Sequence, residues 1–182
     1  MKAPQIKTSY GVLALSSGVV ISLIFLALSY IVQGVFQAAF FIVGMALLWY
    51  FSHSLSHYLS AKIYRVNTLY FYIGRSELRK VKSPFSNLFS KYLVTVGTKL
   101  DRKKFSSLPA SSRAIVMGSG AISSTILSML VLIYALVHGT GLLALILGGL
   151  FFFANLATEI LFSTKAGDLG KMKEELRKKP IA

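Results

Sequence analysis

The fold is decided by the stretch Phe51-Ser52-His53-Ser54-Leu55-Ser56-His57-Tyr58-Leu59-Ser60-Ala61-Lys62, which closes a long apolar run and carries two of the chain's three histidines. His53 and His57 are four residues apart, so on a helix both imidazoles lie on one face, one turn apart. Two imidazoles in this arrangement can share one metal ion. The spacing alone leaves three interpretations open: metal ligation, a hydrogen-bonded structural pair, and haem ligation.

The composition predicts a membrane protein. Of the 182 residues, 54% are apolar and only 14% are charged, whereas soluble domains usually have about 25% charged residues. A membrane-spanning helix needs about 20 predominantly apolar residues. Four runs meet this requirement, at residues 11–32, 35–61, 115–137 and 142–162. We therefore expect a mainly α-helical, polytopic membrane protein, a single membrane domain with four transmembrane helices.

The distribution of charge predicts the orientation. The net charge is +14, and all 20 lysines and arginines lie outside the four runs. Two precede the first run, 12 lie between Lys62 and Arg113, and 6 follow Phe162. The positive-inside rule then places both termini, residues 62–114 and the tail 163–182 in the cytoplasm. Basic flanks of this kind face the anionic headgroups of the bilayer and do not indicate nucleic-acid binding. The chain has no cysteine, so disulfides and thiolate metal sites are excluded.

The segment between the second and third runs carries two strand signals. Thr68–Gly74 is rich in β-branched and aromatic residues and ends in glycine, and Tyr92–Gly97 shows a similar pattern. They predict a short β-hairpin or edge-strand pair on the cytoplasmic side. Near the end of the chain, Leu169 to Lys179 has the pattern of an amphipathic surface helix. Asp168 stands where it could cap the N-terminus of that helix.

Glu159 is the only acidic residue within any of the four apolar runs. Its position before Lys165 predicts a depth of about 9 Å from the cytoplasmic boundary, close to the level of His57. Ionisable residues inside a membrane are costly and mark functional sites. Glu159 is therefore a candidate base or metal ligand beside the histidines.

The order of these features resembles the site-2 protease family of intramembrane zinc metallopeptidases. In that family, a His-Glu-x-x-His helix is followed by a basic, Ala-rich stretch and a strand that ends Phe-Ser-Ile-Gly. This chain has His53-Ser-Leu-Ser-His57, then Leu59-Ser-Ala-Lys-Ile-Tyr-Arg-Val66, then Phe71-Tyr-Ile-Gly74. The small-residue patch from Gly118 to Ser124 resembles the family's Gly-Pro-x-x-Asn helix start without its Pro and Asn, and Asn155 with Asp168-Leu-Gly170 loosely resembles the Asn…Asp-Gly motif.

The resemblance implies roles for particular residues. His53 and His57 would bind zinc, with Asp168 as the third ligand. The strand formed by Thr68, Leu69, Tyr70, Phe71, Tyr72, Ile73 and Gly74 would be the edge to which an unwound substrate or partner segment adds. Ser54 replaces the family's catalytic Glu, and a serine hydroxyl cannot take a proton from water at a metal near neutral pH.

From these features we expect a site-2-protease-like protein of the cell membrane that is proteolytically inactive. It would bind zinc and act as a binding or assembly subunit for other membrane proteins or transmembrane peptides, within a larger complex. Two alternatives stay open at the level of the sequence. One is an active intramembrane zinc metalloprotease whose displaced general base is Glu159. The other is a membrane protein that binds haem through the histidine pair.

Overall fold

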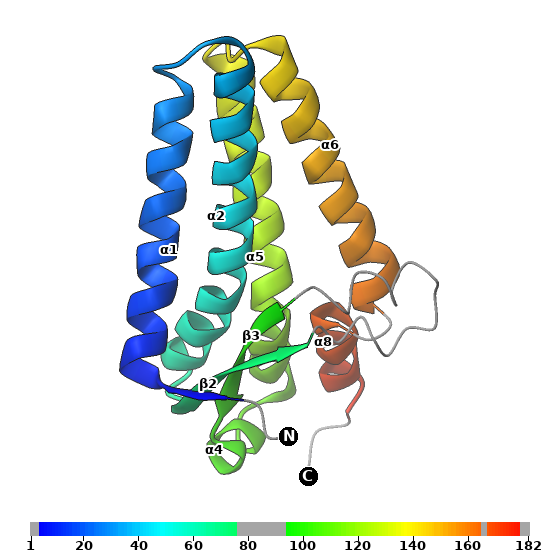
Figure 1. Cartoon of the computed structure of the whole chain (residues 1–182). Helices are drawn as coiled ribbons and strands as arrows, with labels where there is room; N and C mark the ends of the chain where they lie inside the picture. The colour runs from blue at the N-terminus through cyan, green and yellow to red at the C-terminus, as the bar shows by residue number, and fades with distance from the viewer. Residues whose placement is uncertain (1–3, 76–93, 165–166, 179–182) are drawn as a thin grey trace.

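The computed structural model describes residues 4–75, 94–164 and 167–178, and it confirms the predicted fold class (Figure 1). Four helices are long and apolar enough to cross a membrane. They are α1 (Thr8–Ser29), α2 (Gly34–Ile63), α5 (Ala110–Val137) and α6 (Leu142–Thr158), which continues into the π-helical turn η2 (Glu159–Ser163). Helix α5 begins five residues before the predicted run. It can include Arg113 because that guanidinium bonds to Glu175 and to the Leu108 carbonyl oxygen.

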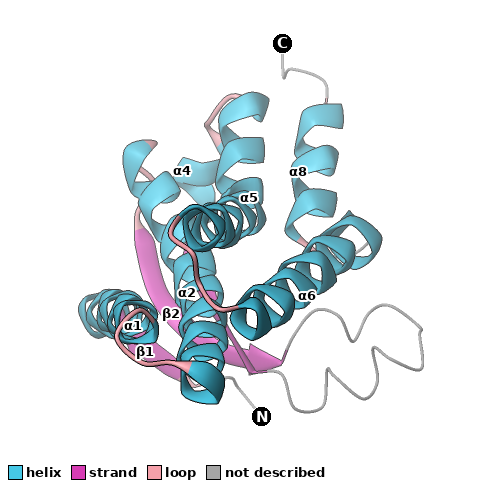
Figure 2. Ribbon diagram, turned by 90° about the horizontal axis from the view of Figure 1, so that it is seen from above, coloured by secondary structure: helices cyan, strands magenta, loops and turns pink. Residues whose placement is uncertain are grey.

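Helix α2 is the centre of the bundle. Seen along the helices, it lies between α1 and α6, with α5 beside it (Figure 2). Glycines let α6 and α1 approach α2 closely. A Cβ added at Gly148 of α6 would lie 2.5 Å from the Phe41 ring of α2, and one at Gly18 of α1 would lie 2.3 Å from the Phe51 ring of α2. The core toward the end of the bundle opposite the sheet consists of buried apolar residues from all four helices: Leu26, Ala38, Phe41, Met45, Leu48, Ala135 and Ala144.

The sheet has three antiparallel strands in the order β1 (Gln5–Lys7), β2 (Thr68–Arg75) and β3 (Val94–Leu100). The strand predicted at Thr68–Gly74 is confirmed as part of β2. The second predicted strand is confirmed from residue 94 onward, while its first two residues lie outside the described residues. The chain's own N-terminal segment adds the third strand, which the sequence pattern did not predict because three residues carry too little periodicity.

The sheet and the short helices lie at one end of the bundle (Figure 1). Helix α4 (Arg102–Ser106) begins after Asp101, whose carboxylate accepts hydrogen bonds from the backbone N–H groups of Lys103 and Lys104. The predicted C-terminal amphipathic helix is confirmed as α8 (Asp168–Arg177). These elements share the end that the positive-inside rule assigns to the cytoplasm, and that assignment stays a prediction.

Candidate metal centre

Three predicted ligands meet at one point near the sheet end of the bundle. His53 and His57 project from α2, and Asp168 is the first residue of α8. Oδ2 of Asp168 lies 3.0 Å from Nε2 of His53 and 2.9 Å from Nε2 of His57. The three side chains are partly buried, with 28%, 19% and 16% of the side-chain surface exposed for His53, His57 and Asp168. Residues 111 positions apart in the chain are thus brought into contact.

The hydrogen bonds behind His57 orient its ring for metal binding. Nδ1 lies 2.9 Å from the carbonyl oxygen of Val116 on α5. A carbonyl oxygen only accepts hydrogen bonds, so Nδ1 carries the hydrogen and the neutral ring has its lone pair on Nε2. A backbone carbonyl behind the ring is a common outer partner of metal-binding histidines. Nδ1 of His53 has a longer contact, 3.5 Å to the Ser124 hydroxyl.

The arrangement fits a metal ion. Nε2 of His57 and Oδ2 of Asp168 lie 2.9 Å apart, and either a proton shared in a hydrogen bond or a metal ion bound by both atoms satisfies this contact. One ligand atom from each of His53, His57 and Asp168 lies within 4.8 Å of the others, so the group can hold an ion. Ligand atoms around a tetrahedral zinc with bonds of about 2.0–2.1 Å are about 3.3 Å apart, a few tenths of an ångström more than the distances seen here. Two imidazoles and a carboxylate are ligands that zinc accepts.

Gly120 of α5 lies directly against the two imidazoles. A Cβ added there would lie 2.4 Å from Nε2 of His57 and 2.9 Å from Nε2 of His53. The missing side chain therefore leaves open the space next to both metal-binding nitrogens. From the sequence, Gly120 is only one member of the small-residue patch from Gly118 to Ser124 that resembles the family's Gly-Pro-x-x-Asn helix start. The role of Gly120 becomes visible only when α5 is placed beside α2.

Helix α8 is docked so that Asp168 faces the histidines. A Cβ at Gly118 would lie 2.5 Å from the sulfur of Met172, so that sulfur lies close against the α5 backbone. One turn further along α8, Glu175 accepts a hydrogen bond of 2.6 Å from Nε of Arg113. Gly167 holds the N-cap position of α8 and Asp168 is the first helical residue, with Oδ2 turned toward the histidines. Of the two interpretations of Asp168, the geometry favours the ligand over the cap.

The electrostatics of Asp168 agree with this arrangement. Burial by itself would raise the pKa of the Asp168 carboxyl, but its hydrogen bonds to His53 and His57 outweigh burial and hold that pKa well below its usual range. Lys171 adds a more distant positive charge, 3.8 Å from Oδ1. The carboxylate is therefore ionised at neutral pH, which is the form that binds a metal.

Ser54 points away from the metal-binding group. Its hydroxyl donates a hydrogen bond of 2.8 Å to the carbonyl oxygen of Val96 on β3, and only 4% of the residue is exposed. Residues that are adjacent in a helix point about 100° apart, so Ser54 turns toward the sheet while His53 faces Asp168. The position that holds the catalytic Glu in the family that the sequence resembles is here used to attach the sheet to α2.

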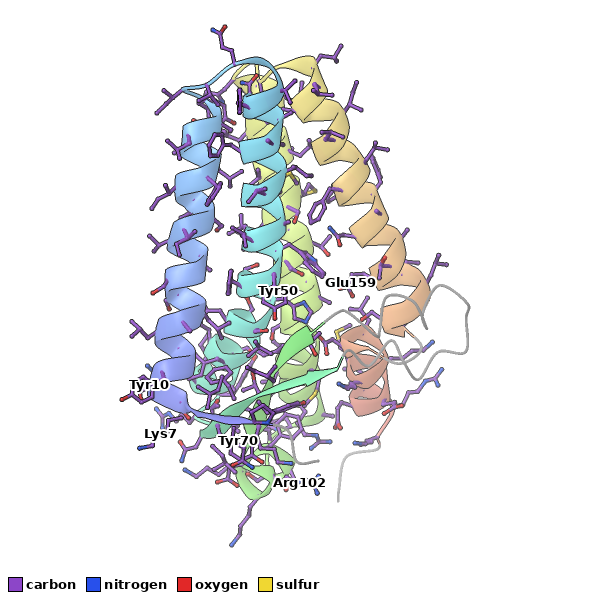
Figure 3. All side chains as sticks on the ribbon, viewed as in Figure 1. Lys7, Tyr10, Tyr50, Tyr70, Arg102 and Glu159 are labelled. Carbon is purple, nitrogen blue, oxygen red and sulfur yellow. The ribbon has the colours of Figure 1, made fainter. Side chains whose placement is uncertain are left out.

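Glu159 lies near the metal-binding group but is not part of it. Figure 3 shows this residue on the side of α6 that faces α2 and α5. Its carboxylate interacts electrostatically with His53, His57 and Asp168, and the Ser163 side chain hydrogen-bonds to it. Oε2 is buried and has no hydrogen-bond partner among the described residues. Glu159 is therefore close enough for its charge to act on His53, His57 and Asp168, while its depth in the membrane stays a prediction.

The expected partner strand is placed differently from the prediction. Residues Thr68–Gly74 do not form a free edge, because β2 is the central strand of the sheet. Gln5 to Lys7 of β1 pair with Tyr72 to Tyr70 on one side, and β3 pairs along the other. The β1 segment is also fixed to β2, since the Thr8 hydroxyl donates to the Thr68 carbonyl oxygen. Thr68–Gly74 therefore does not offer the free edge that was predicted, and partner binding by these residues stays a prediction.

The third histidine does not join the site. His138 follows α5 at the opposite end of the bundle, stacks on Tyr134 at 3.8 Å between ring centroids, and is exposed. His53 and His57 both direct Nε2 to the same side, toward Asp168. A bis-histidine haem takes its two axial ligands from opposite faces of the iron, and the shared direction of the two Nε2 atoms does not suit that arrangement.

No family model, curated protein or solved structure matches the chain. The resemblance to the site-2 protease family therefore rests on the residues and on their arrangement.

Proposed function

We propose that the chain is a site-2-protease-like integral membrane protein that holds zinc at His53, His57 and Asp168 and binds other membrane proteins without cleaving them. The observation that carries this proposal is the position of Ser54. Its hydroxyl is buried and bonded to the Val96 carbonyl oxygen, so neither its chemistry nor its direction suits a general base.

Zinc bound at this site would polarise carbonyl groups and lower the pKa of water. His57 would bind through Nε2, because Nδ1 donates to the Val116 carbonyl oxygen. Asp168 would neutralise part of the positive charge and attach the start of α8 to α2. Because its ligands come from α2 and α8, the ion would join two elements that are far apart in the chain, as structural zinc sites do.

Partner binding by strand addition would use the outer edge of β1 or of β3, since both edges of β2 are paired. The edge of β3 lies nearer the metal-binding group, but at Val96 its carbonyl oxygen is already bonded to Ser54 of α2, so an added strand would pair only with the rest of that edge. A transmembrane partner segment that unwinds there would reach the sheet and the histidines together.

The test uses purified protein in nanodiscs and a fluorescein-labelled poly-leucine transmembrane peptide interrupted by a central Asn-Gly pair. We expect about one zinc per chain, lost in His57→Ala and reduced in Asp168→Asn because both side chains are ligands. We expect the peptide to bind without being cleaved. A wild-type protein that neither retains zinc nor binds the peptide would contradict the proposal.

A second candidate is an active metallopeptidase with Glu159 as the general base, because this carboxylate is buried, unpaired at Oε2 among the described residues, and interacts with His53. A positioned base contributes about 10²–10⁴-fold in rate. Metal-dependent cleavage that persists in Ser54→Ala but disappears in Glu159→Gln would establish this candidate and overturn the first. A peptide that stays intact with the wild type rejects it.

A further inference from the structure

A cavity of about 600 Å³ lies at the sheet end of the bundle, between α4, the start of α5 and the end of α8. Its lining among the described residues is Arg102, Phe105, Ser106, Arg113, Glu175 and Lys178. Three of these side chains are cationic and one is acidic, so the lining carries a net charge of +2. Glu175 lies about two turns of α8 beyond Asp168, which separates this cavity from the metal-binding group. Its charge selects an anion, and its volume is in the range of about 300–1,000 Å³ that holds whole small molecules.

Glu175 holds two of the three cations in place. Its Oε2 accepts a hydrogen bond of 2.6 Å from Nε of Arg113, and its Oε1 accepts one from Nζ of Lys178. Nη1 of Arg113 donates to the carbonyl oxygens of Ser106 and Leu108, and only 11% of the Arg113 side chain is exposed. A guanidinium has five N–H donors and an ammonium has three. Among the described residues, Arg113 and Lys178 therefore keep donors for an anion while Glu175 fixes their positions.

Arg102 supplies the third positive charge from α4, at the sheet end of the bundle (Figure 3). It is exposed, and within the part of the chain that the structure describes its guanidinium forms no hydrogen bond or ion pair. Phe105, three residues later on the same side of α4, packs against the buried cluster of Ala61, Val66 and Val116. The short helix is thereby held against α2 and α5, and Arg102 stays beside the cavity.

The cavity lies where the lipid-facing surface of α5 begins. Ile115, Ile122 and Ile126 share one face of α5 and expose 49%, 44% and 46% of their surface. Ile115 follows Arg113 by two residues, about 3 Å along the helix axis. The cations of the cavity are therefore at the edge of the apolar surface, which is the level of the phosphate groups of a bilayer. Basic pockets at this level bind the headgroups of anionic lipids.

We propose that this cavity binds the headgroup of one anionic phospholipid, whose phosphate is held by Arg102, Arg113 and Lys178. Guanidinium groups bind phosphate through two parallel hydrogen bonds, and an ammonium adds a point charge. The Phe105 ring offers an apolar wall to the glycerol end of the lipid. Because the three cations come from α4, α5 and α8, the bound lipid would join these elements at the membrane surface. The proposal does not depend on a metal ion at the histidines.

Native mass spectrometry of the protein in a neutral detergent counts bound lipids and gives their affinity. The two probes are dioctanoyl phosphatidylglycerol, which is anionic, and dioctanoyl phosphatidylcholine, which has no net charge. We expect one phosphatidylglycerol per chain, bound about 10-fold or more tightly than phosphatidylcholine. The result should be the same in zinc-loaded and chelator-treated protein, so a failure of zinc binding would leave it unchanged. Equal affinity for the two lipids would overturn the proposal.

Two variants distinguish a defined site from general attraction between basic residues and headgroups. Arg102→Gln removes a charge at the cavity and should weaken phosphatidylglycerol binding about 10-fold or more. Lys103→Gln is the matched control, because it removes the same charge from the next exposed position of α4, which is not among the lining residues. It should weaken binding by less than about 3-fold. Equal losses in the two variants would overturn the site.

Inorganic phosphate tests the source of the anion. A lipid is bound through its phosphate and also through its glycerol end, so inorganic phosphate at the same concentration should not displace phosphatidylglycerol. Displacement by phosphate at that concentration would assign the cavity to a free anion and overturn the lipid assignment.

Discussion

Replacement of Gly120 by alanine should abolish tight zinc binding. The added Cβ would lie 2.4 Å from Nε2 of His57 and 2.9 Å from Nε2 of His53. Non-bonded carbon and nitrogen atoms are comfortable at about 3.5 Å, so the His57 ring would have to retreat by roughly 1 Å. That movement is about half of a zinc–nitrogen bond of about 2.0–2.1 Å. The substitution thus displaces His57 as a ligand without changing the chemistry of its imidazole.

A lower limit can be given for the expected loss of zinc affinity. Changes to the outer partners of metal ligands typically weaken affinity about 10–100-fold, and displacement of a ligand belongs at or beyond the upper end. We expect zinc affinity at least about 100-fold weaker, equivalent to about 2.7 kcal/mol. The backbone is not at risk, because alanine stabilises a helix interior by roughly 0.5–1 kcal/mol relative to glycine.

Competition with a fluorescent zinc chelator, on protein purified without chelator, measures the affinity. Gly149→Ala is the matched control, since a Cβ at Gly149 of α6 meets no atom within 4 Å. It should bind zinc as the wild type does. Wild-type affinity in Gly120→Ala would refute the reasoning, because it would mean that the ion is not held by the two Nε2 atoms beside this residue.

Three further predictions concern the surroundings of the site. Ser54→Ala leaves the Val96 carbonyl oxygen without its hydrogen bond of 2.8 Å. Thermal unfolding should show a loss of about 1–3 kcal/mol in stability, while the zinc content of the protein stays unchanged. A loss of zinc would show that Ser54 acts on the metal-binding group. Burial would raise the pKa of Glu175, but hydrogen bonds from Lys178 and Arg113 hold it below its usual value. Its stabilisation of α8 is therefore present above the unfolded value of about 4.3 and is lost as pH falls below it. Limited proteolysis should cut α8 faster at low pH in the wild type, and Glu175→Gln should remove that pH dependence. The topology can be tested with single cysteines at Gln33 and Ser106, which are both exposed positions. An impermeant thiol reagent added outside sealed cells should label Gln33→Cys and not Ser106→Cys. Labelling of Ser106→Cys would show that the predicted orientation is wrong.

The bundle was predictable from the sequence because its main signals are local. Apolar runs of membrane length and the absence of basic residues within them do not depend on packing, and all four runs became helices. The strand at Thr68–Gly74 was predictable for the same reason, since the segment is rich in β-branched and aromatic residues and ends in glycine. Its place in the sheet was not, because Gln5–Lys7 pairs with it across a long stretch of chain and is too short to carry a pattern.

The residue types of the candidate site were predictable from the sequence, but the neighbouring groups that position them were not. The i, i+4 spacing indicated that His53 and His57 share a face, whereas the choice of Asp168 as the third ligand came from the family resemblance. Spacing does not reveal that the Val116 carbonyl orients His57, or that Gly120 opens the space beside both rings. Those roles belong to a backbone oxygen and to a missing side chain, which have no sequence signature.

The measurement that tests the central claim most directly is zinc-edge X-ray absorption on the purified protein, with zinc quantified in the same sample. The account predicts about one zinc per chain, with two imidazole nitrogens and oxygen ligands at about 2.0–2.2 Å. It also predicts a spectrum that loses an oxygen ligand in Asp168→Ala and loses imidazole scattering in His57→Ala. A protein without zinc, or a zinc spectrum that neither substitution changes, would contradict the claim that His53, His57 and Asp168 form a metal centre.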